Sequence, residues 1–231
     1  MIVRFGYVAM SVEVKNASPS KTMTWTRFSK LEDRAAALRL LERIAAENLH
    51  NTLRLLRHNR AHGIRLYRCS SRLIPLFGHE ALPDWDPISA LAEPFAAIGD
   101  YARRHAMRLS FHPDHYTVLS TPRADVFARS VADLDRHTRM LEAMGLDESA
   151  KLNIHIGGTY GNKKAAMARF LKQFAALDPR IVRRITLEND DKTFTASETL
   201  AVAEQLGVPM VLDLHHDQVN PSEEAPEALW P

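Results

Sequence analysis

The sequence predicts an α/β fold of the (β/α) TIM-barrel type, with six βα units and a barrel that is incomplete at its C-terminal end. Six short apolar runs alternate with segments of helical periodicity, which is typical of a parallel sheet with helical crossovers. Four of these runs end on a histidine or a carboxylate, and a barrel gathers such residues from several strands at one face. No GxGxxG or GxxxxGKS/T motif occurs, so an open nucleotide-binding sheet has no motif in its favour.

Length and composition suit one soluble domain, which we expect to span residues 1–231. Apolar residues make up 45% of the chain and charged residues 25%, which excludes a disordered or fibrous protein. A net charge of +2 permits a nucleic-acid partner without requiring one. The single cysteine, Cys69, excludes a disulfide scaffold, and neither a signal peptide nor a membrane-length apolar run is present in the sequence. We therefore expect a cytoplasmic protein.

The first half of the chain predicts three strands and two helices. Strands are expected at residues 2–9, 64–70 and 107–111, where β-branched and aromatic residues cluster. A long loop at residues 11–28 offers Trp25 and Phe28 as anchors. One long helix, or two joined ones, is expected from Leu31 to near Gly63. Asp86 and Pro87 begin the next helix, as N-cap and first helical residue.

The second half predicts three more βα units. Strands are expected at residues 151–156, 185–188 and 208–212, and helices at residues 121–144, 162–177 and 196–206. Six units do not close an eight-stranded barrel, so the barrel is smaller or this chain is a truncated or split version. Uncovered strands favour low stability or self-association, with a second chain or segment as a possible partner that completes the barrel.

Residues that bind metals stand at the ends of the last four strands. The candidate ligands are His112, His155, Glu188, Asp213 and one of His215 or His216. Imidazole and carboxylate together suit Zn²⁺ or Mn²⁺. Five ligands exceed the need of one tetrahedral ion, so a carboxylate, Glu188 or Asp213, is expected to bridge two ions in a site for phosphoryl transfer. We assign the catalytic roles to Glu188 and His155.

Each of these residues also has a structural interpretation. A single strand-end histidine often makes only a hydrogen bond, Asp213 could cap the next turn, and Glu188 could pair with an arginine. His215 shares the strand side of Asp213, but His216 suits a turn that brings both inward, and we favour His216. The remaining histidines are expected to be surface or capping residues: His50, His58, His62, His79, His105 and His137.

Groups suited to an anionic substrate surround the candidate ligands. Tyr116 is placed to stack on a base and His115 to wedge or hydrogen-bond beside it. The segment from Gly157 to Lys163 offers close backbone approach, Tyr160, and Lys163 with Lys164 for phosphate, although it also fits a tight turn into a helix. Tyr7 is a further aromatic candidate, or a residue that fills the barrel mouth.

Six motifs together resemble the ultraviolet-damage endonuclease family, of the UvsE or UVDE type. They begin at Phe5 (FGYVAMS), Asn16 (NASPSKT), Ser110 (SFHPDHY), Asn153 (NIHIGGTYGNK), Leu187 (LENDDKT) and Leu212 (LDLHH). The resemblance implies a TIM barrel that binds up to three divalent metals and nicks double-stranded DNA on the 5′ side of pyrimidine dimers and other lesions. Manganese is the expected metal, with Zn²⁺ or Mg²⁺ as alternatives.

The resemblance also assigns roles by motif. It implies that His112, His155, Glu188, Asp213 and His216 are metal ligands, and that His115 and Tyr116 push into the duplex opposite the lesion, where relatives commonly carry Gln-Tyr. Tyr7 and Ser11 fall in a loop region that contacts DNA. The family's last two βα units, with further histidine, glutamate and lysine ligands, have no counterpart in this sequence.

Two rival interpretations follow from the same residues. A sugar isomerase or epimerase of the same barrel superfamily also uses strand-end Glu, Asp and His for metal. A non-catalytic DNA-binding fragment would account for the missing units.

Overall fold

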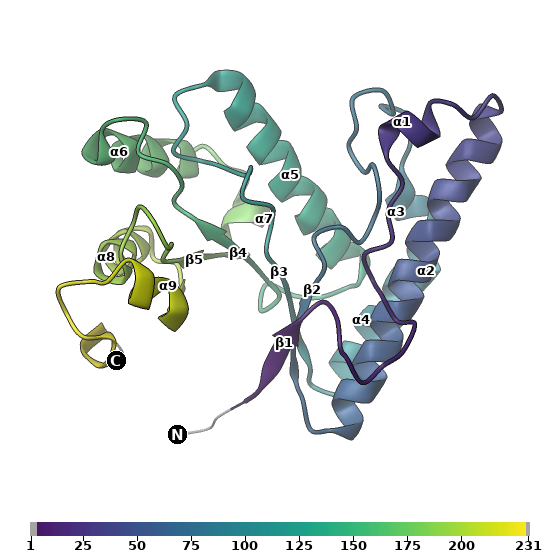
Figure 1. Cartoon of the computed structure of the whole chain (residues 1–231), viewed down its shortest axis with the longest axis horizontal. Helices are drawn as coiled ribbons and strands as arrows, with labels where there is room; N and C mark the ends of the chain where they lie inside the picture. The colour runs from purple at the N-terminus through teal and green to yellow at the C-terminus, as the bar shows by residue number, and fades with distance from the viewer. Residues whose placement is uncertain (1–3, 230–231) are drawn as a thin grey trace. The chain divides into compact units, whose positions relative to one another are not determined.

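The computed structural model, drawn in Figure 1, describes residues 4–229. These residues group into two compact units. The first unit holds the residues up to His112 together with Arg139–Ala150, and the second holds Pro113–Thr138 together with the residues from Lys151 onward. The expectation of a single domain over the whole chain stays a prediction. Within residues 4–229, no helix is long and apolar enough to cross a membrane.

The first unit contains three parallel strands in sequence order. Strand β1 (Gly6–Val8) pairs with β2 (Leu66–Cys69), and β2 pairs with β3 (Arg108–Phe111). Each strand lies within its predicted range, although β1 is shorter than expected and residues 2 and 3 lie outside the described residues. The register places Tyr67 beside Tyr7 on one side and Leu109 on the other.

Four helices accompany these strands. They are α1 (Trp25–Phe28), α2 (Arg34–Ala61), α3 (Pro87–Ala90) and α4 (Ala92–Arg104). Helix α2 is one helix, capped by Asp33, and Gly63 after it takes a left-handed φ of 71°. The expected helix from Asp86 is interrupted at Leu91, because Pro94 cannot donate a hydrogen bond to the carbonyl of Ala90.

One buried apolar cluster of the first unit forms where α2 meets the long segment before it. Helix α1 lies inside the predicted loop, where the Thr24 side chain caps its first turn. Phe28 is buried, as its expected anchoring role requires. The buried cluster comprises Met23, Phe28, Ala37, Leu41 and Leu82.

The second unit repeats the same architecture. Strand β4 (Lys151–His155) pairs with β5 (Ile185–Glu188), and β5 pairs with β6 (Met210–Val211), all in parallel. Its helices are α6 (Lys163–Phe174), α7 (Pro179–Val182), α8 (Ala196–Leu206), α9 (Leu214–Val219) and the 3₁₀ helix η1 (Pro226–Leu229). Helix α5 (Ala124–Ala143) begins in the second unit and ends in the first.

Local signals explain the boundaries of the second unit. Helix α8 matches its predicted range, with a capping box between Thr195 and Glu198 and a left-handed Gly207 at its end. Helix α9 was not expected, and it forms because the Asp213 side chain caps it.

In each unit, strands that follow one another in sequence are neighbours in the sheet. Helices connect these parallel strands, so the predicted α/β class is confirmed, with six strands among residues 4–229. A doubly wound sheet would instead change direction at a switch point, which neither unit shows among its described strands. Because the strands are parallel, the carboxyl ends of β4, β5 and β6 lie along one edge of the second unit.

Candidate metal centre

Glu188, the last residue of β5, is the central residue of this edge. Its side chain is 3% exposed, and the Asn153 side-chain amide donates a hydrogen bond to its carboxylate. The Thr186 hydroxyl in turn donates to the Asn153 side-chain oxygen over 2.9 Å. Two neighbouring strands therefore hold the buried carboxylate in one orientation.

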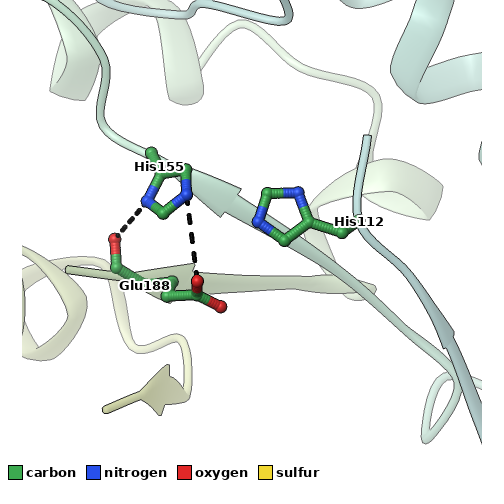
Figure 2. A group of neighbouring side chains, drawn as sticks. All are labelled: His112, His155 and Glu188. Carbon is green, nitrogen blue, oxygen red and sulfur yellow. Dashed lines mark hydrogen bonds and ion pairs between the residues drawn. The ribbon is translucent and has the colours of Figure 1, made fainter. Parts of the chain in front are cut away.

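His155 is paired with Glu188 in the sheet register, and its ring is fixed by the same residue (Figure 2). Its Nδ1 lies 3.1 Å from the backbone carbonyl oxygen of Glu188, which can only accept, so Nδ1 carries the hydrogen. Its Nε2 lies 3.8 Å from the Glu188 carboxylate. That separation is too long for a hydrogen bond. It is below the ~4.2 Å that two ligand atoms of one ion can span with bonds of about 2.1 Å.

Asp213 serves both the cap of α9 and the candidate centre. One of its carboxylate oxygens accepts hydrogen bonds from the backbone amides of His215 and His216 at 2.8 and 2.9 Å. The other lies 3.7 Å from Nδ1 of His216. Although burial opposes the shift, the His216 amide and the nearby imidazoles hold the pKa of Asp213 below its usual range. The capping role considered from the sequence is real, and it leaves the second oxygen directed at His216.

His216 approaches the same point from α9. Its Nδ1 donates to the Asn189 carbonyl oxygen over 2.9 Å, which leaves the lone pair on Nε2, and Nδ1 lies 3.7 Å from the Glu188 carboxylate. The Asn189 side chain also donates to the Asp213 carbonyl over 2.9 Å and accepts from the Asp213 backbone amide over 2.8 Å. Ligand atoms of Glu188, Asp213 and His216 all lie within 4.8 Å of one another. The His215 side chain is exposed and lies outside this group.

The donor set fits a divalent metal ion. A carboxyl group that is 3% exposed can ionise only with positive charge nearby, because desolvation penalises the ion strongly. The groups around it are imidazoles and a second carboxylate, which is the mixed N/O set of zinc and manganese sites. His112 follows β3 in the first unit with a half-buried side chain, and its membership of the centre stays a prediction.

His115 and Tyr116 form an exposed pair on the loop after β3. The His115 side chain is 75% exposed and Tyr116 is 76% exposed, and their ring centroids are 4.0 Å apart. The His115 Nδ1 lies 2.8 Å from the Asp114 carboxylate. Tyr116 also lines a surface cavity of about 470 Å³ with Arg129 and Arg136. The exposed faces of these rings are surfaces on which a nucleic-acid base could stack.

The segment from Gly157 to Lys163 forms a tight turn into helix α6, which is one of the two interpretations that the sequence allows. Gly157 has a φ of 104°, and a Cβ there would collide with Val118 and Ser120. Tyr160 is 49% exposed. Lys163 is engaged rather than free, because its ammonium lies 2.6 Å from the Glu198 carboxylate. The exposed neighbour Lys164 is therefore better placed for a phosphate than Lys163.

Tyr7 and Ser11 belong to the first unit. The Tyr7 hydroxyl donates to the Asn59 side chain over 2.6 Å, and its ring meets Tyr67 edge-on at 5.5 Å. Burial raises the pKa of Tyr7 against the opposing hydrogen bonds with Asn59 and Ser11. The internal contacts of Tyr7 match its alternative role as a filling residue, and DNA contact by Tyr7 and Ser11 stays a prediction.

Sequence reasoning overlooked the two asparagines that orient the candidate ligands. Asn153 precedes His155 by two residues on β4, so both side chains point to the same side of the strand. Asn189 directly follows Glu188. Their positions beside the candidate ligands were the signal that could have identified them.

Comparisons with known proteins extend over almost the whole chain. The family model described as UV-endonuclease UvdE matches residues 3–231. A UV DNA damage endonuclease of Halalkalibacterium halodurans is 43% identical over all of this chain and 71% of its own length. One of Bacillus velezensis is 42% identical over 97% of this chain and 70% of its own length.

Solved structures agree with this relationship. The crystal structure of SacUVDE matches with a TM-score of 0.87 and 28% identity, covering 99% of this chain and 75% of that one. A D-psicose 3-epimerase from Clostridium cellulolyticum H10 matches with a TM-score of 0.56 at 14% identity, covering 77% and 62%. The epimerase likeness shows the barrel-type fold alone. On the family model and these relatives, the chain belongs to the UV-endonuclease UvdE family.

Proposed function

We propose that this chain is a metal-dependent DNA repair endonuclease that nicks the phosphodiester on the 5′ side of pyrimidine dimers and other distorting lesions. Membership of the UvdE family over residues 3–231 carries the proposal. Relatives named UV DNA damage endonuclease support the activity on ultraviolet damage. The cytoplasmic location expected from the lone cysteine belongs to the same proposal.

Glu188, Asp213, His216 and His155 would hold the divalent metal, with His112 as a further ligand. Manganese remains the first expectation, and zinc or magnesium the alternatives. When bound, such an ion activates water and neutralises charge on the scissile phosphate. Glu188 lies close to both His155 and the Asp213–His216 pair, which supports its expected bridging position between two ions.

The protein's own groups keep the centre in a defined state. The carbonyl of Glu188 holds the hydrogen of His155 on Nδ1, which leaves the Nε2 lone pair facing the carboxylate. The Asn153 amide keeps the Glu188 carboxylate from rotating away. Little reorganisation is then needed when a phosphate arrives, which is how preorganised sites favour a transition state.

Lesion recognition is assigned to His115 and Tyr116. Both rings stand out from the loop after β3, so they can insert where a lesion has weakened base stacking. Unstacking costs least at damaged positions, and this difference favours distorted over intact duplex. Tyr160, Lys163 and Lys164 are assigned to contacts with the DNA backbone beside the lesion. Because Lys163 is paired with Glu198, Lys164 supplies most of the positive charge for a phosphate.

A plasmid nicking assay tests this function. Supercoiled plasmid irradiated with ultraviolet light should be converted to the open circle with Mn²⁺ and spared with chelator. Equal cutting of irradiated and untreated plasmid would contradict the recognition of lesions. Chelator-insensitive DNA binding without nicking would favour a non-catalytic fragment, and ketose interconversion without nicking would favour the epimerase alternative.

A further inference from the structure

A second cavity lies in the first unit. It has a volume of about 440 Å³ and is lined by Arg60 and by residues 63–65 and 104–107. These segments lead into β2 and β3, so the cavity is at the N-terminal ends of those strands. His112 stands at the opposite end of β3, and enzymatic sites of α/β barrels lie at that C-terminal end. The proposed nuclease function therefore does not use this cavity.

Two similar helix ends build the cavity. Helices α2 and α4 pack against each other, as Figure 1 shows, and a left-handed residue lies two positions after the end of each, Gly63 at φ 71° and Ala106 at φ 50°. In both cases the backbone amide of the next residue donates a hydrogen bond to a carbonyl of the preceding helix: Ile64 to Asn59, and Met107 to Ala102. Positive φ is uncommon for alanine, so the second turn is held by its surroundings.

The strand register brings the two turns side by side. Leu66 is paired with Arg108, and the Arg108 amide donates to the Arg65 carbonyl over 2.8 Å. The start of β2 therefore lies next to the start of β3. Arg65 joins Arg60 from the end of α2 and Arg104 from the end of α4 around one opening.

The three arginines give this opening a surplus of positive charge. Within residues 4–229, none of Arg60, Arg65 and Arg104 has a carboxylate partner at ion-pair distance, although adjacent Arg103 pairs with Asp100. Basic residues at helix C-termini often balance the helix dipole, which amounts to roughly −0.5 charge for each helix. Two helix ends balance about one of the three positive charges, which leaves about two.

His105 lies in the same cationic surroundings. Burial, followed by the charges of Arg60 and Arg104, lowers the pKa of this imidazole. Ile64 and Met107 add an apolar part to the lining. The cavity thus offers cationic and apolar walls within a volume typical of small-molecule sites.

We propose that this cavity binds a phosphate dianion, either as free phosphate or as the terminal group of a phosphate monoester. Planar guanidinium groups match phosphate oxygens in pairs, and a charge of nearly −2 matches the surplus left by the helix dipoles. A backbone phosphodiester carries only one negative charge and fits this surplus less well.

Phosphate titration of the purified chain with chelator present tests the proposal. The ring signals of His105 in a ¹H–¹³C NMR spectrum report on the cavity itself. The probes are inorganic phosphate, a nucleoside 5′-monophosphate and dimethyl phosphate. The test variant is Arg65→Gln with Arg104→Gln, and the matched control is Arg39→Gln with Arg57→Gln, which removes the same charge from exposed positions on α2.

We expect saturable shifts with phosphate and the monophosphate, and binding at least about ten-fold weaker in the test variant but unchanged in the control. If the double variant does not fold, Arg65→Gln alone serves, because Arg65 lies outside the helices. Equal binding of dimethyl phosphate would overturn the proposal in favour of a nucleic-acid backbone site. Absence of saturation, or equal loss in the control, would overturn it in favour of diffuse electrostatic attraction. Neither result bears on the nuclease assay.

Discussion

Asp213 caps α9 and is also a proposed metal ligand, and two substitutions separate these roles. Asp213→Asn keeps a side-chain oxygen that can accept from the His215 and His216 amides, but it removes the negative charge. Asp213→Ala removes both. Asparagine and aspartate are about equally good N-caps, whereas alanine costs about 1 kcal/mol. In chelator, we therefore expect Asp213→Ala to be about 1 kcal/mol less stable than Asp213→Asn, which loses only the contribution of the charge.

Metal ions add the second comparison. A ligand at 100 times its dissociation constant stabilises the native state by about 2.7 kcal/mol. Urea unfolding with and without Mn²⁺ should show a stabilisation of this order for the unmodified chain. The second carboxylate oxygen of Asp213 lies 3.7 Å from His216, the neighbouring proposed ligand, so both variants should lose most of this metal-dependent stabilisation. If Asp213→Asn keeps the full metal-dependent stabilisation, Asp213 is a cap only and the proposed ligand set is wrong.

Three further predictions concern the surroundings of the centre. Asn153→Ala frees the Glu188 carboxylate, so metal affinity measured by calorimetry should fall about 10- to 100-fold; unchanged affinity would remove Asn153 from the site. Tyr116→Ala should leave unfolding within about 0.5 kcal/mol and metal binding unchanged, since the ring is exposed, yet reduce nicking of irradiated plasmid at least about ten-fold, while Tyr116→Phe stays active. Although burial opposes the shift, Lys163 and Thr195 lower the pKa of Glu198. Its contribution to stability is therefore present above the ordinary pKa of 4.5 and is lost as pH falls through the lowered value. Lys163→Gln should remove that part of the acid sensitivity, and identical acid unfolding of the two proteins would contradict it.

The sequence predicted the order of the elements because the physical signals are local. The capping box of Thr195 and the left-handed Gly207 determine the limits of α8. Asp86 and Pro87 correctly predict where a helix begins, but the later Pro94 divides the predicted helix into α3 and α4. No helix was predicted after Asp213, yet the same carboxylate that suggested a ligand also caps α9.

The candidate centre could be predicted by residue type, but its hydrogen bonds could not. Strand-end positions of His155, Glu188 and Asp213 follow from apolar patterning, since parallel strands end at one edge. The choice of tautomer of His155 depends on a carbonyl of the neighbouring strand, which only the register of β4 and β5 determines. The pairing of Lys163 with Glu198 joins residues 35 positions apart in the sequence, counted from 163 to 198, and no local pattern encodes it.

Metal content tests the central claim most directly. The purified chain, loaded with Mn²⁺ and freed of excess ion, should retain at least about one ion per chain by elemental analysis, as a built centre requires. Glu188→Gln preserves the volume of the side chain while removing its buried charge, so it should retain clearly less metal and lose nicking of irradiated plasmid. No retained metal in the unmodified chain, or equal metal in both proteins, would contradict a metal centre organised around Glu188.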